Sequence, residues 1–210
     1  QGTTMTVTGS HLLVAAGRRP NIEGLNLEAA GVSAGPRGIE TDRRLRTSNR
    51  RIYAIGDVNG RFPFTHAAGY HGGIVLRNAL FRLPAKVDDR AMPWVTYTDP
   101  ELAQVGMSEA AARAERGQVT VLRWPFHDND RAQAERKTHG FVKAVVDRGG
   151  RILGAAIVGP HAGELLQPWC LAIANGLKIG AMAGVIAPYP TLGEVNKRVA
   201  GSYYLPKLFS

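Results

Sequence analysis

The sequence predicts an α/β segment over residues 1–89, followed by an α+β domain over residues 90–210. In the first part, short apolar runs end at glycine, and one of them precedes a stretch that can form a helix, as in strand–turn–helix units. A polar, proline-containing stretch at residues 84–92 marks the boundary. Beyond it, short strand-like runs are interspersed with helical stretches, which is typical of a sheet with helices beside it.

The composition is that of an ordinary globular protein, with 44% hydrophobic and 20% charged residues in 210. The formal net charge is +9, but the arginines are scattered and form no run with interleaved aromatics, so we expect no nucleic-acid partner. No apolar run reaches the roughly 18–20 residues that span a bilayer. The single cysteine, Cys170, lies in an apolar run, excludes an intrachain disulfide and indicates a cytoplasmic protein.

Two strands are expected near the N-terminus. Residues 3–8 alternate like a strand already in progress, and residues 11–16 form an apolar run that ends at Gly17. Gln1 is not a natural start. We therefore expect the chain to be a piece of a longer protein.

The stretch at residues 52–57 predicts a short buried strand that ends at Gly56 and Asp57. Glycine allows the backbone to turn and another group to approach closely. A carboxylate at the carboxyl end of such a strand can accept hydrogen bonds from a ribose or polyol hydroxyl. Taken alone, the same residues would be read as a strand followed by an ordinary turn.

A helix is expected to begin with Thr65 as its N-cap and to run to about residue 80. Its glycines at positions 69, 72 and 73 are poor helix formers. They make sense if a flat group or another helix packs closely against this face. The first turn offers unpaired N–H donors and the positive end of the helix dipole.

The second part predicts five strands and four helices, with Arg148-Gly149-Gly150-Arg151 as a hairpin turn. Ser108 is expected to cap the first of these helices, and Gly117 to end it. The expected strands cover residues 94–97, 102–105, 119–126, 140–147 and 152–158. The other expected helices cover residues 162–175, 179–185 and 192–204.

Four segments, at residues 15–21, 52–57, 95–101 and 189–194, carry a resemblance when they are taken in order. Together they resemble the C-terminal half of the flavin-dependent pyridine nucleotide–disulfide oxidoreductases, the family of dihydrolipoamide dehydrogenase, glutathione reductase and mercuric reductase. The runs at residues 129–132 and 154–160 favour the mercuric-reductase-like branch.

This resemblance implies the C-terminal part of an FAD-binding α/β domain, preceded by the end of the nicotinamide domain and followed by an antiparallel-sheet dimerisation domain with flanking helices. It implies that Asp57 binds the ribityl chain of the flavin and that the Thr65 N–H lies near the pyrimidine edge. The implied cofactors are FAD and NAD(P)H, both expected only in the complete enzyme. The implied cofactor-binding residues are Gly17, Gly56, Asp57, Phe64, Thr65 and His66.

His66 is otherwise read as a structural histidine. His66 and His71 are five residues apart, off a common helical face, so no metal ligands are expected.

The C-terminal turn departs from the family pattern. In the disulfide reductases a histidine precedes the proline and pairs with a glutamate as acid–base catalyst; here Glu194 is kept, but Tyr189 replaces the histidine. A phenol that titrates near pH 10 is a poor base at neutral pH, so exchange with a disulfide is disfavoured. Tyr189 could instead donate a hydrogen bond or line a pocket for a metal ion or quinone. Alternatively, Tyr189 and Glu194 are ordinary interface residues.

The family's Gly-x-Gly-x-x-Gly turn and its Cys-x4-Cys redox pair are not found in this sequence. We therefore expect the missing N-terminal half to supply them, and the chain to be inert by itself. Residues 90–210 are expected to form a homodimer. The alternative is a dimerisation or binding module with no redox role.

Overall fold

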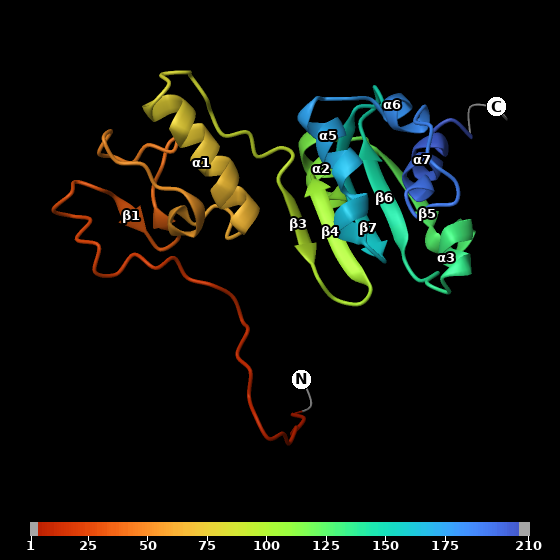
Figure 1. The fold of residues 1–210 in the computed structure, drawn as a ribbon, viewed down its shortest axis with the longest axis horizontal. Coiled ribbons are helices and arrows are strands. Elements are labelled where there is room, and N and C mark those ends of the chain that lie inside the picture. Colours follow the sequence, from red (N-terminus) through yellow and green to blue (C-terminus); the bar gives the residue numbers. More distant parts are fainter. Residues whose placement is uncertain (1–3, 206–210) are drawn as a thin grey trace. The chain divides into compact units, whose positions relative to one another are not determined.

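The computed structural model describes residues 4–205, and the chain divides into two compact units, residues 1–87 and 88–210 (Figure 1). Helix α1 (Thr65–Ala79) is the main element of the first unit. A short hairpin of β1 (Ala34–Gly35) and β2 (Gly38–Ile39) and the 3-10 helix η1 (Gly56–Asn59) complete its regular structure. Ile74 on the buried face of α1 packs with Leu45, Ala85 and Val87.

The two strands expected near the N-terminus do not form in the described residues 4–17. Strands need partners for their backbone N–H and C=O groups, and this segment lies in solvent: Leu12 and Leu13 are 88% and 87% exposed. The alternation of residues 3–8 and 11–16 therefore predicted the wrong local structure for this chain.

The expected strand at residues 52–57 is reduced to a single bridge, in which Tyr53 pairs with Arg46. The backbone N–H of Thr47 donates to Ile52 O at 3.0 Å, and that of Ala54 to Leu45 O at 3.1 Å. The strand ends there because Gly56, with φ +67°, turns the backbone into η1.

Helix α1 begins at Thr65, one residue earlier than expected, so Thr65 is not its N-cap. Phe64 occupies the N-cap position with an extended backbone, and the N–H of Ala68 donates to its carbonyl at 3.0 Å. A phenylalanine has no side-chain oxygen, so no side chain caps this helix.

The second unit contains the antiparallel sheet that the sequence predicts, with strand order β3-β4-β7-β6-β5. Adjacent strands are antiparallel throughout, with Ala103 opposite Ile157 and Ala144 opposite Ala155 in the central pairs. The strands are β3 (Pro93–Thr96), β4 (Glu101–Gly106), β5 (Thr120–Pro125), β6 (Phe141–Val146) and β7 (Ile152–Gly159).

Six α-helices flank this sheet in the described part of the second unit. As predicted, Ser108 caps the first of them, its Oγ accepting from the N–H of Ala111 at 3.2 Å. The helices are α2 (Glu109–Arg116), α3 (Asp130–Ala134), α4 (Ala162–Leu165), α5 (Gln167–Ala174), α6 (Ile179–Ala183) and α7 (Glu194–Gly201), and the 3-10 helix η2 (Phe126–Asp128) precedes α3.

The single helix expected over residues 162–175 is divided at Leu166 into α4 and α5. Pro168 explains the break, because it has no N–H to donate to the carbonyl four residues earlier. The last helix is also shorter than the expected range of residues 192–204.

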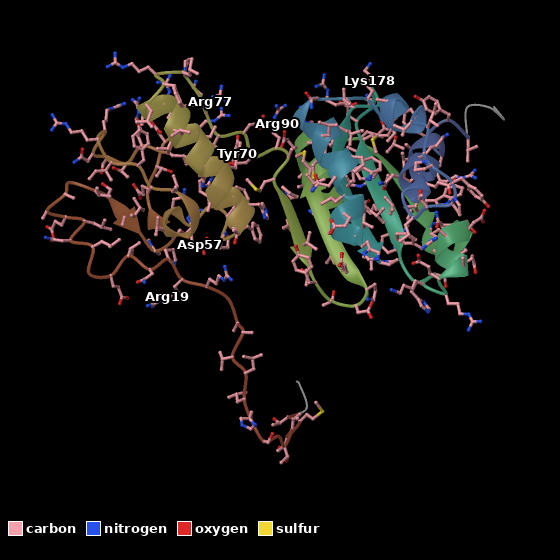
Figure 2. All side chains as sticks on the ribbon, viewed as in Figure 1. Arg19, Asp57, Tyr70, Arg77, Arg90 and Lys178 are labelled. Carbon is pink, nitrogen blue, oxygen red and sulfur yellow. The ribbon has the colours of Figure 1, made fainter. Side chains whose placement is uncertain are left out.

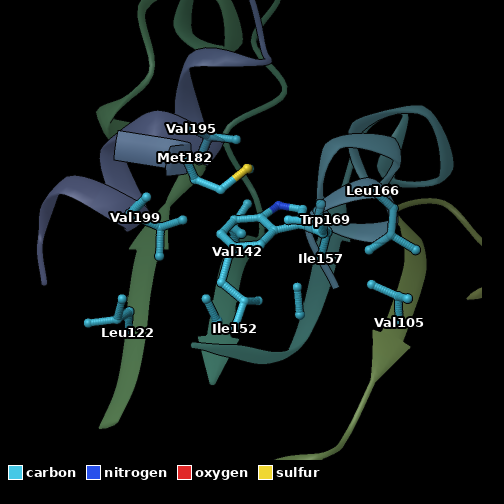
Figure 3. Packing of buried hydrophobic residues seen from close by; sticks show 14 of the residues in the cluster. Val105, Leu122, Val142, Ile152, Ile157, Leu166, Trp169, Met182, Val195 and Val199 are labelled. Atoms are coloured by element: carbon cyan, nitrogen blue, oxygen red, sulfur yellow. The ribbon is translucent and has the colours of Figure 1, made fainter. Parts of the chain in front are cut away.

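Trp169 of α5 is fully buried at the centre of the main core (Figure 3). Strand alternation divides the residues of β6 between two clusters: Val142, Ala144 and Val146 belong to this core, whereas Val145 packs with Ala112 of α2 in a separate, smaller cluster. Helices thus cover both faces of the sheet. None of the helices within residues 4–205 has the length and apolar character needed to cross a bilayer.

Candidate functional site

The turn at Gly56 and Asp57 presents a carboxylate to solvent in the first unit (Figure 2). Gly56 has φ +67°, and a Cβ there would lie 3.0 Å from the Cβ of Ala68, so the turn requires glycine. The Asp57 side chain is 48% exposed, with Oδ2 3.5 Å from Nη1 of Arg18. The carboxylate is therefore anchored by its backbone but open to a ligand.

His71, in the second helical turn of α1, stabilises the Gly56–Asp57 turn through a hydrogen bond. It is fully buried, and its Nδ1 accepts a hydrogen bond of 3.2 Å from the N–H of Gly56. An imidazole nitrogen that accepts carries no proton, so the neutral ring has its proton on Nε2. Sequence spacing gave no signal for this contact, because it joins a side chain to a backbone group fifteen residues away.

The N-terminus of α1 lies eight residues after Asp57, and no side chain caps it. The rings of Phe64 and His66 stack there, with centroids 5.1 Å apart and an interplanar angle of 9°. Thr65 and His66 are exposed. The first-turn N–H groups and the positive end of the helix dipole can thus meet an anionic or acceptor group.

Farther along α1, small residues leave open space on one side of the helix. A Cβ added at Gly69, Gly72 or Gly73 would meet no atom within 4 Å. Gly17 is likewise exposed, with φ +122° and no neighbour within 4 Å, but Arg18 after it reaches both Asp57 and the carbonyl of Pro63. The predicted cofactor residues thus all lie in this first unit.

The second candidate turn precedes α7 and carries Tyr189 and Glu194. The Tyr189 side chain is 70% exposed, and its hydroxyl donates a hydrogen bond of 2.9 Å to Oδ2 of Asp130. This hydrogen bond, together with the negative charge of Asp130, raises the pKa of Tyr189 above its ordinary value. Glu194 does not share the hydroxyl; its Oε2 accepts from the N–H of Thr191 at 3.4 Å.

Asn129 fixes this turn from the loop before α3. It is 4% exposed; its Nδ2 donates to the carbonyl of Thr191 at 3.0 Å, and its Oδ1 accepts from the N–H of Ala132 at 2.9 Å. In the sequence, residues 129–132 stand out only as a run typical of one branch of a family. Its contacts with the turn could not be read from a separation of about sixty residues.

No cluster of three or more His, Cys, Asp or Glu residues suited to a metal ion is found within residues 4–205.

Both units match known sequence families. The model for the dimerisation domain of the pyridine nucleotide-disulphide oxidoreductases matches residues 92–200, and a second model, for pyridine nucleotide-disulphide oxidoreductases, matches residues 1–72. The chain therefore belongs to the pyridine nucleotide-disulphide oxidoreductase family, which confirms the resemblance inferred from the four segments.

Particular relatives include two kinds of enzyme. The chain is 37% identical over 202 residues to a dihydrolipoyl dehydrogenase of Bacillus subtilis, covering 95% of this chain and 43% of that protein. It is 40% identical over 201 residues to a mercuric reductase of Staphylococcus aureus, covering 95% and 37%. The chain thus spans about two fifths of the length of these relatives.

Solved structures agree with this assignment. LpdA from Mycobacterium tuberculosis superposes with a TM-score of 0.88 at 32% identity, covering 95% of this chain and 44% of that one. The HOCl-induced flavoprotein disulfide reductase RclA from Escherichia coli superposes with a TM-score of 0.82 at 29% identity, covering 89% and 44%. RclA has also been solved as a Cu(II) complex.

Proposed function

We propose that this chain is the C-terminal portion of an FAD-dependent NAD(P)H oxidoreductase and contributes part of the flavin site together with the dimerisation domain. The observation that carries the proposal is the Asp57 turn: a solvent-facing carboxylate, held by Gly56 and His71, that precedes an uncapped helix N-terminus. In this proposal residues 1–89 contain the end of the nicotinamide domain and the second flavin-binding segment, and residues 90–210 form the interface domain.

The residues present fit FAD. Asp57 would accept hydrogen bonds from ribityl hydroxyls, and the Thr65 N–H would face the pyrimidine edge of the flavin. The open side of α1 at Gly69 and Gly73 leaves room for a flat ring system. Gly17, Phe64 and His66 would line the same site. When bound, FAD supplies the chemistry that takes a hydride from NAD(P)H and passes electrons to an acceptor.

Exposed apolar residues in the first unit support a missing partner segment. Large apolar side chains so fully exposed on one short segment are normally covered by another part of a protein. In the proposal, the N-terminal half of the enzyme covers it and supplies the phosphate-binding glycine turn and the redox cysteine pair, so the chain alone is inert. The residues are Met5, Val7, Leu12, Leu13 and Val14.

The second unit supports a homodimer. The sequence match to a dimerisation domain covers most of it. Several large apolar side chains are exposed there, and Ile186 is 93% exposed. Burial of this surface against a second copy would remove it from water. The residues are Tyr97, Leu171, Val185 and Ile186.

Tyr189 bears on the electron acceptor. A phenol at its ordinary pKa is already protonated at neutral pH, and the hydrogen bond to Asp130 raises the pKa of Tyr189 further, so the phenol cannot take over the proton shuttle that a histidine performs at this position in the family. We therefore favour a metal ion or a quinone over a disulfide. The Cu(II) complex of RclA is consistent with a metal acceptor.

The test of the flavin site uses the complete protein, or this chain reconstituted with its N-terminal half. We expect bound FAD with its visible absorbance, and at least about tenfold weaker FAD binding in Asp57→Ala, because a hydrogen bond to a charged group is lost. Glu23→Ala, which removes an exposed carboxylate elsewhere in the same unit, should bind FAD normally. A dimer that never binds FAD would instead favour the dimerisation-module alternative.

The acceptor and the dimer are tested separately. Turnover of lipoamide as fast as that of Cu(II) or a quinone would contradict the acceptor assignment. In sedimentation experiments Ile186→Asp should shift the dimer toward monomer, whereas Leu25→Asp, at an exposed leucine of the first unit, should not. An unchanged dimer in Ile186→Asp would rule out this surface.

A further inference from the structure

The turn that carries Tyr189 is held by two neighbouring side chains at the start of α3. Asn129 donates to the backbone carbonyl of Thr191, and Asp130 accepts from the exposed Tyr189 hydroxyl. Asn129 is buried and caps α3, so Asp130, the first residue of that helix, has a fixed backbone position. The capped start of α3 thus places Asp130 beside Tyr189.

The direction of this hydrogen bond determines what the hydroxyl can offer. A phenol has one proton to donate and lone pairs that accept, whereas an ionised carboxylate only accepts. With its proton directed to Oδ2 of Asp130, Tyr189 presents its lone pairs to solvent. Glu194, by contrast, is engaged with the backbone of the turn at Thr191.

We propose that Asp130, rather than Glu194, is the positioning residue for Tyr189, and that it orients the hydroxyl so that the electron acceptor meets a hydrogen-bond-accepting oxygen. The pairing of Asp130 with Tyr189 concerns this chain alone. The role of the Tyr189 oxygen toward an electron acceptor rests on the proposed function. A cation or a donor group is favoured at such an oxygen, while a quinone carbonyl, which only accepts, gains nothing from it.

The first experiment uses the 210-residue chain labelled with 13C at the tyrosine ring. Tyr189→Phe identifies the Tyr189 signal, whose pH titration is then followed in variants. Asp130→Asn removes the charge beside the phenol and should lower the pKa of Tyr189. Glu194→Gln removes a charge in the same turn and should lower it less, because Asp130 is the main cause of the shift. Equal effects of the two variants, or none from Asp130→Asn, would overturn the pairing.

The second experiment uses the complete flavoenzyme with Cu(II) and 1,4-benzoquinone as acceptors. Asp130→Ala frees the Tyr189 proton for donation, so the ratio of kcat/KM for Cu(II) to that for the quinone should fall about tenfold, the size expected for one hydrogen bond. Tyr189→Phe should abolish the effect of Asp130→Ala in the double variant. An unchanged ratio would overturn the orientation proposal. Failure to bind FAD would overturn the proposed function and leave the NMR result standing.

Discussion

The indole Nε1 of Trp169 donates a hydrogen bond of 2.8 Å to Oδ1 of Asn196, and both side chains are buried. The Nδ2 of Asn196 donates in turn to the carbonyl of Leu165 at 2.8 Å. One amide thereby links α4, α5 and α7 above the sheet. Buried polar groups of this kind are costly to leave without partners.

Replacement of Asn196 by alanine should destabilise the chain by about 2–4 kcal/mol, because the Trp169 N–H and the Leu165 carbonyl both lose their partner. Urea unfolding followed by far-UV circular dichroism measures this. Asn175→Ala, at an exposed asparagine that bonds the carbonyl of Leu171 at the end of α5, should cost less than about 1 kcal/mol. Equal stability of the two variants would contradict the role of Asn196.

Replacement of His71 by leucine should loosen the Asp57 turn. The buried N–H of Gly56 then has no acceptor, at a cost of about 1–3 kcal/mol, and its amide should exchange faster with solvent in NMR experiments. His71→Gln supplies a new acceptor and should preserve part of the protection. The same leucine substitution at the exposed His139 should have no effect on this amide.

Alanine at Gly69 and Gly73 should raise the melting temperature of this chain, because each replacement favours the helix by about 1 kcal/mol and meets no neighbour. Gly56→Ala should lower it, because φ is +67° and Ala68 lies 3.0 Å from the new Cβ. If FAD packs against α1 as proposed, the stabilising double variant should also bind FAD more weakly. Stabilisation without any loss of FAD affinity would place the cofactor elsewhere.

Cys170 should react slowly with iodoacetamide at pH 8. Burial raises the pKa of its thiol, and only the thiolate is nucleophilic. Raising the pH above 8 should therefore increase the alkylation rate of the folded chain by a larger factor than that of an ordinary thiol, which is already partly ionised at pH 8. In guanidinium, where the thiol is exposed, the reaction should already be fast at pH 8. Mass spectrometry of the alkylated fraction measures both. A folded chain that reacts as fast as the unfolded one would contradict this.

The sheet of the second unit could be predicted because its strands pair with one another within the chain, so alternation, glycine turns and the Ser108 cap all agree with the final structure. The first unit differs. Residues 11–16 have a strand-like pattern but no described strand partner, and the strand at residues 52–57 is stopped by the Gly56 turn after one bridge. Local pattern cannot show whether a partner strand is present.

The candidate site was predicted only as far as short motifs allow. Asp57 and Tyr189 stand out by position and by residue type. Their supporting residues, His71 and Asp130, do not, because each contact crosses from one element to another: a ring to a backbone amide, and a carboxylate to a phenol. Thr65 was wrongly predicted as the N-cap from its residue type. The helix already begins at Thr65, so Phe64 occupies the N-cap position.

The double role of Asn129 has a consequence for how this protein can diverge. The same amide begins α3 and holds the backbone at Thr191. An insertion or deletion in the loop before α3 or in the turn before α7 would move Asn129 away from Thr191. Natural variants should therefore keep the lengths of this loop and this turn fixed or change them together. A substitution at position 189 is therefore easier to tolerate than a change in the number of residues between Asn129 and Thr191.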